Sequence, residues 1–220
     1  MKYKSVFDII GPIMIGPSSS HTAGVVKIGK LARMLFGGDP KKANIYFYGS
    51  FAQTYKGHAT DVAIVGGLLG FEPNDKRIRN SLDYAEKNGI EINFFSDNHE
   101  QQHPNTLMME LFDDKKTMRI TGVSLGGGAV AITRINNFSI HLSGELPALL
   151  VMHNDVYGVM ASVLNKIAAH RINVAYMTTS RSDKGGEALM VIESDEKIDN
   201  DVVEAISKLD NIIWVKTLSM

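Results

Sequence analysis

The order of elements in the last third of the chain constrains the fold more than any other feature. Leu149 to Met152 has the composition of a strand, and a helical stripe of apolar residues follows it. The stripe recurs at three- and four-residue steps, as in a helix packed by one face, and its members are Val156, Val159, Met160, Val163, Leu164 and Ile167. We expect this helix to end near Arg171.

Two strands, a second helix and a last strand complete the pattern. Residues 172–178 and 188–192 are rich in strand formers, and the segment between them contains adjacent glycines, which predicts a hairpin. A helix from about Asn200 places one apolar side inward, formed by Val202, Val203, Ile206 and Leu209. Residues 212–215 close the pattern as a strand. The order β-α-β-β-α-β predicts a ferredoxin-like domain, with two helices on one face of a four-stranded antiparallel sheet.

The first 145 residues predict a mixed α/β (α+β) domain with less regular spacing. Residues 21–36 form an amphipathic helix, and residues 76–88 a surface helix. Val62 to Leu69 is apolar on every side and contains two glycines, which favours a closely packed buried helix, with a buried strand as the alternative. The expected strands are 45–48, 90–95, 106–112, 118–125 and 129–135. Turn formers at 143–147 predict a boundary between domains 1–145 and 146–220.

Composition excludes several classes of function. Apolar residues are 44% and charged residues 21%, the balance of a chain that folds around a core. A net charge of -1 without basic runs argues against nucleic-acid partners. No apolar stretch is long enough for a membrane span, and no signal-type segment follows the first residues, so we expect a cytoplasmic protein. The chain has no cysteine, which excludes disulfides and any cluster held by its own thiolates.

The densest polar cluster spans residues 16–24, where a loop becomes a helix. It contains Ser18, Ser19, Ser20, His21 and Thr22. Hydroxyls and free backbone N–H groups at a helix start bind carboxylates or phosphates, and the histidine adds a titratable group. The alternative is a serine-rich helix cap beside an exposed histidine.

Two further clusters contain residue types that act in catalysis or ligand binding. His58, Thr60 and Asp61 precede an apolar segment, where Asp61 or Thr60 caps the helix or Asp61 orients a histidine for acid-base work. The loop at 122–129 contains Ser124, Gly126 and Gly127 among its residues. Its glycines permit close approach to a ligand, a sharp bend, a β-bulge or the phosphate cradle of a pyridoxal phosphate enzyme.

Together, the motifs at 16–24, 49–61 and 122–128 resemble the β chain of iron-sulfur-dependent L-serine dehydratase. The resemblance spans nearly the whole chain and implies conversion of L-serine to pyruvate and ammonia. It also implies a partner α chain whose cysteines hold a 4Fe-4S cluster. The implied catalytic residues are His21 and His58. The implied substrate-binding residues are Ser18, Ser19, Ser20, Thr22, Thr60, Asp61, Ser124, Gly126 and Gly127.

The C-terminal segment is similar to an ACT domain in the turn at 153–158 and the helix exit at 171–174. The resemblance implies self-association and an amino-acid effector, such as L-serine, bound between two copies. The implied effector residues are His153, Asp155, Gly158 and Asn173. Tyr157 stands where the family often has proline, and the simpler interpretation is that His153 and Asp155 cap the helix.

Two other functions remain open from the sequence. The first is a regulatory protein without chemistry of its own, in which both domains bind an amino acid or phosphate. The second, weaker alternative is a pyridoxal phosphate lyase, which depends on the glycine loop and on a lysine for the Schiff base. No lysine lies in a context that specifically favours this cofactor.

Overall fold

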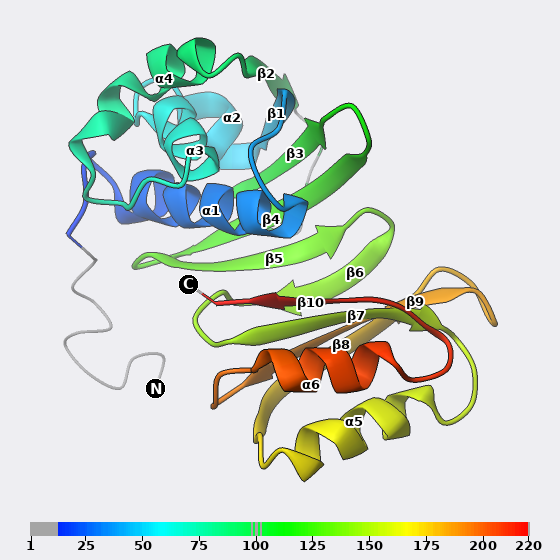
Figure 1. Ribbon diagram of the computed structural model, residues 1–220. Coiled ribbons are helices and arrows are strands. Elements are labelled where there is room, and N and C mark those ends of the chain that lie inside the picture. Colours follow the sequence, from blue (N-terminus) through cyan, green and yellow to red (C-terminus); the bar gives the residue numbers. More distant parts are fainter. Residues whose placement is uncertain (1–12, 98, 100, 102, 220) are drawn as a thin grey trace. The chain divides into compact units, whose positions relative to one another are not determined.

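The computed structural model describes residues 13–97, 99, 101 and 103–219. It divides into two compact units, the first ending at Asn136 and the second beginning at Asn137. Each unit combines helices with strands, which confirms the mixed α/β fold class (Figure 1). Among the described residues, no helix is long and apolar enough to cross a membrane.

The first unit contains a curved sheet with strands in the order β2-β1-β3-β4-β5. Its strands are β1 (Lys42–Tyr48), β2 (Glu91–Asp97), β3 (Thr106–Phe112), β4 (Thr117–Gly126) and β5 (Ala129–Ile135). Its helices are the π-turn η2 (Ser19–Ala23), α1 (Gly24–Phe36), α2 (Gly49–Thr54), α3 (Thr60–Leu68), the 3-10 turn η3 (Lys76–Asn80) and α4 (Ser81–Lys87). The β1 and β2 strands are parallel, and the other pairs are antiparallel.

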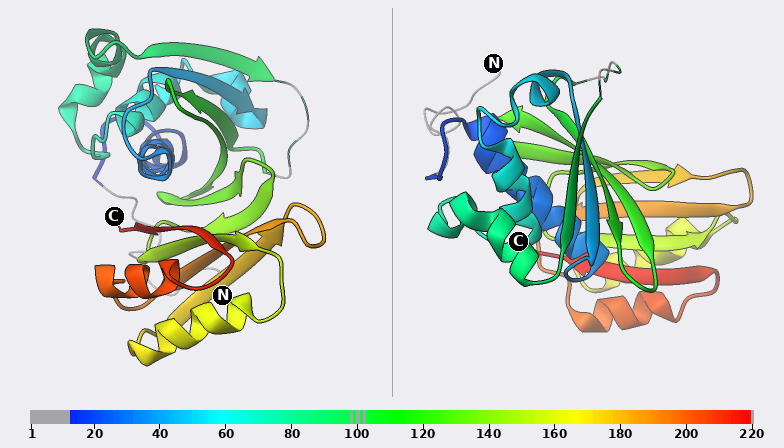
Figure 2. Two further views of the ribbon diagram at one scale, coloured as in Figure 1. Left: turned by 45° about the vertical axis from the view of Figure 1, so that its right-hand side comes forward. Right: turned by 90° about the horizontal axis from the view of Figure 1, so that it is seen from above.

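The core of this unit lies between the sheet and α1, around which the strands curve (Figure 2). Alternate residues Ala43, Ile45 and Phe47 of β1 are fully buried, as the two-residue period of a strand requires. A Cβ at Gly122 would lie 2.6 Å from Ile28 Cγ2, so the missing side chain lets α1 approach β4. The helix is thereby fixed on the sheet.

The helices α1 and α3 cross at two glycines. A Cβ at Gly67 would lie 2.2 Å from the carbonyl oxygen of Val26, and one at Gly29 would lie 2.6 Å from that of Ile64. Only glycine allows two backbones to come this close. The prediction of a buried, closely packed helix is confirmed, and the strand alternative for this segment is wrong.

The sequence pattern missed short elements. The expected surface helix at 76–88 is a 3-10 turn followed by α4, and neither α2 nor β6 (Phe138–Leu142) was expected. The α2 helix has only six residues, too few for a helical apolar stripe to stand out, whereas β6 alternates between buried and more exposed residues and this signal was missed. The α2 helix begins at Gly49, whose φ of 52° turns the chain out of β1.

The second unit has the ferredoxin-like arrangement. Its elements are β6, β7 (Ala148–Asn154), α5 (Val159–Ala169), β8 (Val174–Arg181), β9 (Glu187–Ser194), α6 (Asn200–Ser207) and β10 (Ile212–Leu218). The sheet order is β10-β7-β9-β8 with antiparallel neighbours, which confirms the predicted hairpin. Both helices lie on one face of the sheet, over a core that includes Val151, Val163 and Val202 (Figure 1).

The predicted apolar face of α5 included two residues that are not buried. Val156 lies before the helix and is 45% exposed, and Met160 is 46% exposed. The helix begins only after Gly158, which has a φ of 86°. This left-handed turn rotates the first helical residues, so Val159, Val163 and Ile167 form the buried face.

Candidate active site

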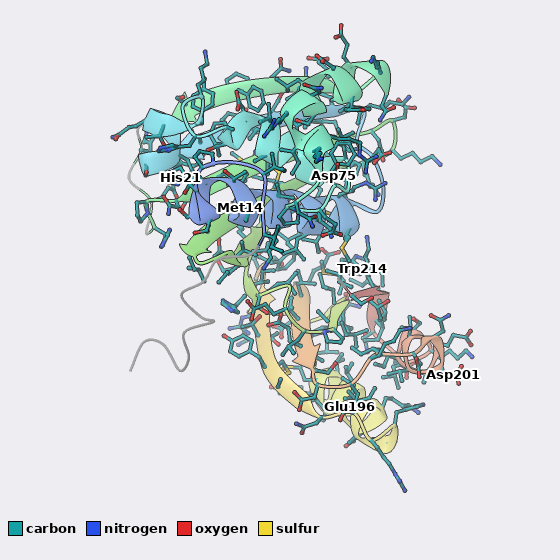
Figure 3. All side chains as sticks on the ribbon, turned by 90° about the vertical axis from the view of Figure 1, so that its left-hand side faces the viewer. Met14, His21, Asp75, Glu196, Asp201 and Trp214 are labelled. Atoms are coloured by element: carbon teal, nitrogen blue, oxygen red, sulfur yellow. The ribbon has the colours of Figure 1, made fainter. Side chains whose placement is uncertain are left out.

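Two histidines that are distant in the sequence meet in the first unit. His21 lies in η2, where it is labelled in Figure 3, and His58 lies just before α3. Their ring centroids are 4.8 Å apart at an interplanar angle of 70°. The edge-on ring of Phe51 lies 5.0 Å from His21. The structure therefore places both predicted catalytic residues in one site.

The π-turn that carries His21 is held by its own serines. The Ser18 hydroxyl accepts the backbone N–H of His21 at 3.2 Å, which confirms a serine cap at the helix start. Ser19 opens the turn. The Thr22 hydroxyl donates to the backbone carbonyl of His58 at 3.4 Å. This bond joins the two histidine segments directly.

The His21 ring contacts hydroxyls on both sides. Its Nδ1 lies 3.0 Å from Ser20 Oγ and 3.3 Å from Ser18 Oγ. Its Nε2 lies 3.2 Å from Ser50 Oγ, at the start of α2. Ser50 was not among the predicted site residues, although it belongs to the second motif of the family resemblance. The exposed histidine of the alternative interpretation is not observed, because His21 is only partly exposed.

The surroundings of His21 favour its neutral form. Burial is the main cause that lowers the pKa of His21 below the ordinary value of 6.5, and repulsion from the nearby His58 lowers it further. A neutral imidazole accepts a hydrogen bond at one nitrogen and donates from the other. At neutral pH, His21 is therefore an uncharged hydrogen-bonding group.

This lowered pKa predicts a pH-dependent stability. The unfolded chain binds a proton at His21 near pH 6.5, whereas the folded chain binds it only at lower pH. The free energy of unfolding should therefore fall as the pH decreases from 6.5 through the folded pKa. Urea unfolding of the wild type and His21→Gln over this range measures the difference. A wild type that gains stability relative to His21→Gln on acidification would contradict the assignment.

Three buried polar atoms near the pair have no hydrogen-bond partner among the described residues. They are Nδ1 of His58, Oγ1 of Thr60 and Oγ of Ser124. Thr60 and Ser124 are fully buried, and a Cβ on Gly24, next to the π-turn, would lie 2.4 Å from Ser124 Oγ. Because an unpaired buried polar group costs about 1–3 kcal/mol, these atoms are suited to a polar ligand.

Asp61 lies in the first turn of α3. Its carboxylate accepts the backbone N–H of Val62 at 2.8 Å. The N-cap of α3 is Ala59, which makes no side-chain cap bond, so the interpretation of Asp61 or Thr60 as the helix cap is wrong. Among the described residues, no bond joins Asp61 to either histidine. Its predicted role in substrate binding stays a prediction.

The glycine loop is a tight hairpin turn between β4 and β5. Gly126, Gly127 and Gly128 have φ values of 95°, 63° and 84°, a left-handed run that suits glycine. The strand register shifts between Ser124 and Gly126, as at a β-bulge. The bend and bulge interpretations are therefore the ones that the geometry supports.

The predicted effector residues divide between two ends of α5. His153 is buried, its Nδ1 donates to the carbonyl of Asn154 at 2.8 Å, and its Nε2 has no described partner. Gly158 lies in the same turn as the N-cap of α5. Asn173 follows the other end of α5, about 16 Å along the helix axis, and donates to Asp195. One chain therefore does not bring Asn173 together with His153.

Asp155 joins two turns of the second unit. Its carboxylate accepts from the backbone N–H of Gly185 and from Arg181, each at 3.1 Å. These bonds, that of Gly185 first, hold the pKa of Asp155 below its ordinary value. The N-cap of α5 is Gly158, so the interpretation of Asp155 as the helix cap is wrong.

Family models match both parts of the chain. The model of the serine dehydratase beta chain matches residues 5–88, and the model of the ACT domain matches residues 148–211. The chain thus combines a serine dehydratase β-chain region with an ACT domain that is C-terminal to it in the sequence. The ACT match agrees with the ferredoxin-like arrangement of the second unit.

Two relatives that match over nearly the full length of the chain identify its family. The chain is 52% identical over 219 residues to the probable L-serine dehydratase beta chain of Bacillus subtilis (strain 168), with 100% of each chain covered. It is 33% identical over 214 residues to the L-serine dehydratase beta chain of Peptoniphilus asaccharolyticus, with 96% of each chain covered. The chain belongs to the L-serine dehydratase β-chain family, which confirms the resemblance.

A more distant relative is named for another activity. The chain is 23% identical over 194 residues to the D-3-phosphoglycerate dehydrogenase of Bacillus subtilis (strain 168). That match covers 88% of this chain and 37% of the dehydrogenase. Similar sequence over both units therefore occurs within a larger protein.

Proposed function

We propose that this chain is the β subunit of an L-serine dehydratase that forms pyruvate and ammonia with a cluster-bearing α subunit. The observation that carries the proposal is the contact between His21 and His58, with unpartnered buried polar atoms beside it. The reaction removes the α-proton and β-hydroxyl of L-serine, and the resulting aminoacrylate hydrolyses. It requires a base for the α-proton and polar groups for the carboxylate and amine.

We assign proton removal to His58. Both ring nitrogens of His21 already contact serine hydroxyls, whereas Nδ1 of His58 has no described partner. A base needs a free lone pair within reach of the proton that it abstracts. We assign the hydroxyls of Thr60 and Ser124, which are buried without a described partner, to the polar ends of L-serine. Ser18, Ser20 and Thr22 shape the turn around them.

The donors present fit a substrate site beside a cluster that another chain holds. This chain has no cysteine, and among its described residues no group of three His, Cys, Asp or Glu side chains could hold a metal ion. When bound, a 4Fe-4S cluster with an open iron position supplies a Lewis acid for the departing hydroxyl, which is a poor leaving group. His58 and the hydroxyls of this chain bind, orient and deprotonate the substrate.

Anaerobic reconstitution tests this function. The full chain is combined with a cysteine-bearing α chain loaded with iron and sulfide, and pyruvate formation from L-serine is followed. We expect turnover only when both chains are present. Equal turnover by the α chain alone would contradict a role of this chain in the site.

We further propose that L-serine binds the ACT domain between two copies of the chain. The unpartnered Nε2 of His153 is an acceptor suited to an ammonium group, and the separation of Asn173 from it fits a site completed by a second copy. Binding at such a site changes activity by a coupling between sites.

Asp155→Ala tests this regulation. Loss of the Asp155 bonds to Gly185 and Arg181 frees the hairpin beside the turn, so calorimetric L-serine affinity should fall about tenfold. Asp183→Ala, in the same hairpin, is the matched control and should keep the affinity. Unaltered affinity and kinetics in Asp155→Ala would count against the effector site.

A non-catalytic amino-acid sensor is the second candidate function. The match to a dehydrogenase over 88% of this chain favours it, because similar sequence occurs in a protein that is named for a different activity. Under this alternative, the first unit binds a ligand without chemistry. Unchanged turnover of the reconstituted complex after combined His21→Ala and His58→Ala substitution would support the sensor.

A further inference from the structure

Segment 103–106, which ends at the first residue of β3, connects two hydroxyl residues of the candidate site. The carbonyl of Pro104 accepts the backbone N–H of Ser50 at 2.8 Å, and the next carbonyl, that of Asn105, accepts the backbone N–H of Ser124 at 3.0 Å. Ser50 lies at the start of α2, and Ser124 lies in β4. Segment 103–106 therefore holds together two elements that are distant in the sequence.

Both of these serines adjoin the π-turn that carries His21. The Oγ of Ser50 lies 3.2 Å from Nε2 of His21. The Oγ of Ser124 is buried without a described partner, and a Cβ on Gly24, the residue after the π-turn, would lie 2.4 Å from it. A shift in the backbone of either serine would therefore move a hydroxyl group at the candidate site.

Segment 103–106 is closed by bonds of its own. The Thr106 hydroxyl donates to the carbonyl of His103 at 2.6 Å, and Nδ1 of His103 accepts the backbone N–H of Asn105 at 3.1 Å. Proline fixes the φ torsion at position 104. The planar peptide group between Pro104 and Asn105 thus donates to His103 and accepts from Ser50. These constraints determine where the carbonyls that hold the two serines point.

The hydroxyl of Thr106 is explained by this bond and not by packing. Thr106 is 3% exposed and pairs with Val123 in the ladder between β3 and β4. A valine side chain has nearly the same shape and suits a buried strand position at least as well. What threonine adds at this position is the donor for the His103 carbonyl.

We propose that Thr106 is a positioning residue that holds Ser124 for substrate binding by closing segment 103–106. Because Ser124 is assigned to a polar end of L-serine, loss of the Thr106 bond weakens the binding of the substrate. This kinetic consequence rests on the proposed function. The positions of the two serine backbones are a property of the full chain without its partner.

Amide hydrogen exchange of the full chain tests the positioning. The N–H groups of Ser50 and Ser124 should exchange at least about tenfold faster in Thr106→Val than in the wild type, because the carbonyls that bind them are no longer fixed. Thr106→Ser keeps the hydroxyl and should exchange like the wild type. Unchanged exchange at Ser124 in Thr106→Val would overturn the proposal. If that variant does not fold, His103→Phe, which removes the acceptor of the Asn105 N–H, decides by the same criterion.

Thr133→Val is the matched control. It makes the same substitution in β5 of the same unit and removes a hydroxyl that donates to the carbonyl of Thr121 at 3.4 Å. Exchange at Ser50 and Ser124 should equal that of the wild type. Equally fast exchange of both amides in this control would indicate a general loss of stability and would refute a specific role of Thr106.

Turnover of the reconstituted complex provides the second measurement. Thr106→Val should raise KM for L-serine about tenfold with kcat changed less than about threefold, the effect of one lost hydrogen bond. In Ser124→Ala, which lacks the positioned hydroxyl, the same substitution should raise KM by less than about threefold more, because coupled residues have non-additive effects. The same factor in both backgrounds would contradict action through Ser124. An inactive wild-type complex would contradict the proposed function, and the exchange result would still decide the role of Thr106.

Discussion

His58→Ala is expected to lower the turnover of the reconstituted enzyme about a thousandfold, within the range that general acid-base catalysis contributes. Nδ1 of His58 is buried without a described partner beside His21, so its removal takes away the proposed base. The effect should fall on kcat, because the hydroxyls that hold the substrate remain. Initial rates of pyruvate formation measure it.

His170→Ala is the matched control for this prediction. Its ring is exposed and bonds to the carbonyl of Lys166 at the end of α5, in the second unit. Its turnover should equal that of the wild type. The assignment is refuted if His58→Ala retains more than about a tenth of the wild-type rate while its thermal unfolding is unchanged.

Gly67→Ala is expected to destabilise the first unit by about 2 kcal/mol. The new Cβ would lie 2.2 Å from the carbonyl oxygen of Val26, so α1 and α3 must separate. Overpacking of this kind costs about 3 kcal/mol, and the higher helix propensity of alanine returns about 1 kcal/mol. Urea unfolding measures the change. Turnover should also fall, because these helices follow the two histidine segments.

Gly66→Ala, in the same helix, is the control for packing. A Cβ at this position would lie 3.0 Å from Cγ1 of Ile78, a side chain that can move. It gains the same helix propensity without a backbone clash, so its stability should stay within about 1 kcal/mol of the wild type. If Gly67→Ala were as stable as Gly66→Ala, the close crossing would not limit this core.

Local patterns predicted most of the elements because periodicity is carried by a few adjacent residues. The strands at 106–112 and 129–135 were predicted with their observed bounds, and the βαββαβ order was confirmed. The prediction was wrong where backbone geometry overrides periodicity. The left-handed Gly158 delays α5, so Val156 is excluded from its buried face.

The candidate site shows the same division between local and distant information. The first two motifs supplied His21 and His58, and the resemblance supplied their implied roles. The sequence carried no sign that Ser50 contacts His21 or that Asp155 binds the hairpin at Gly185. These bonds join segments whose distance depends on the packing between them.

The sequence by itself determined the βαββαβ order of the C-terminal part, the family and the absence of thiolate ligands in this chain, because these follow from residue type and local spacing. Only the tertiary structure decided which of the predicted residues meet. His21 and His58 are neighbours because glycines at the crossing of α1 and α3 let two backbones approach. Asn173 is apart from His153 because the rigid length of α5 lies between them.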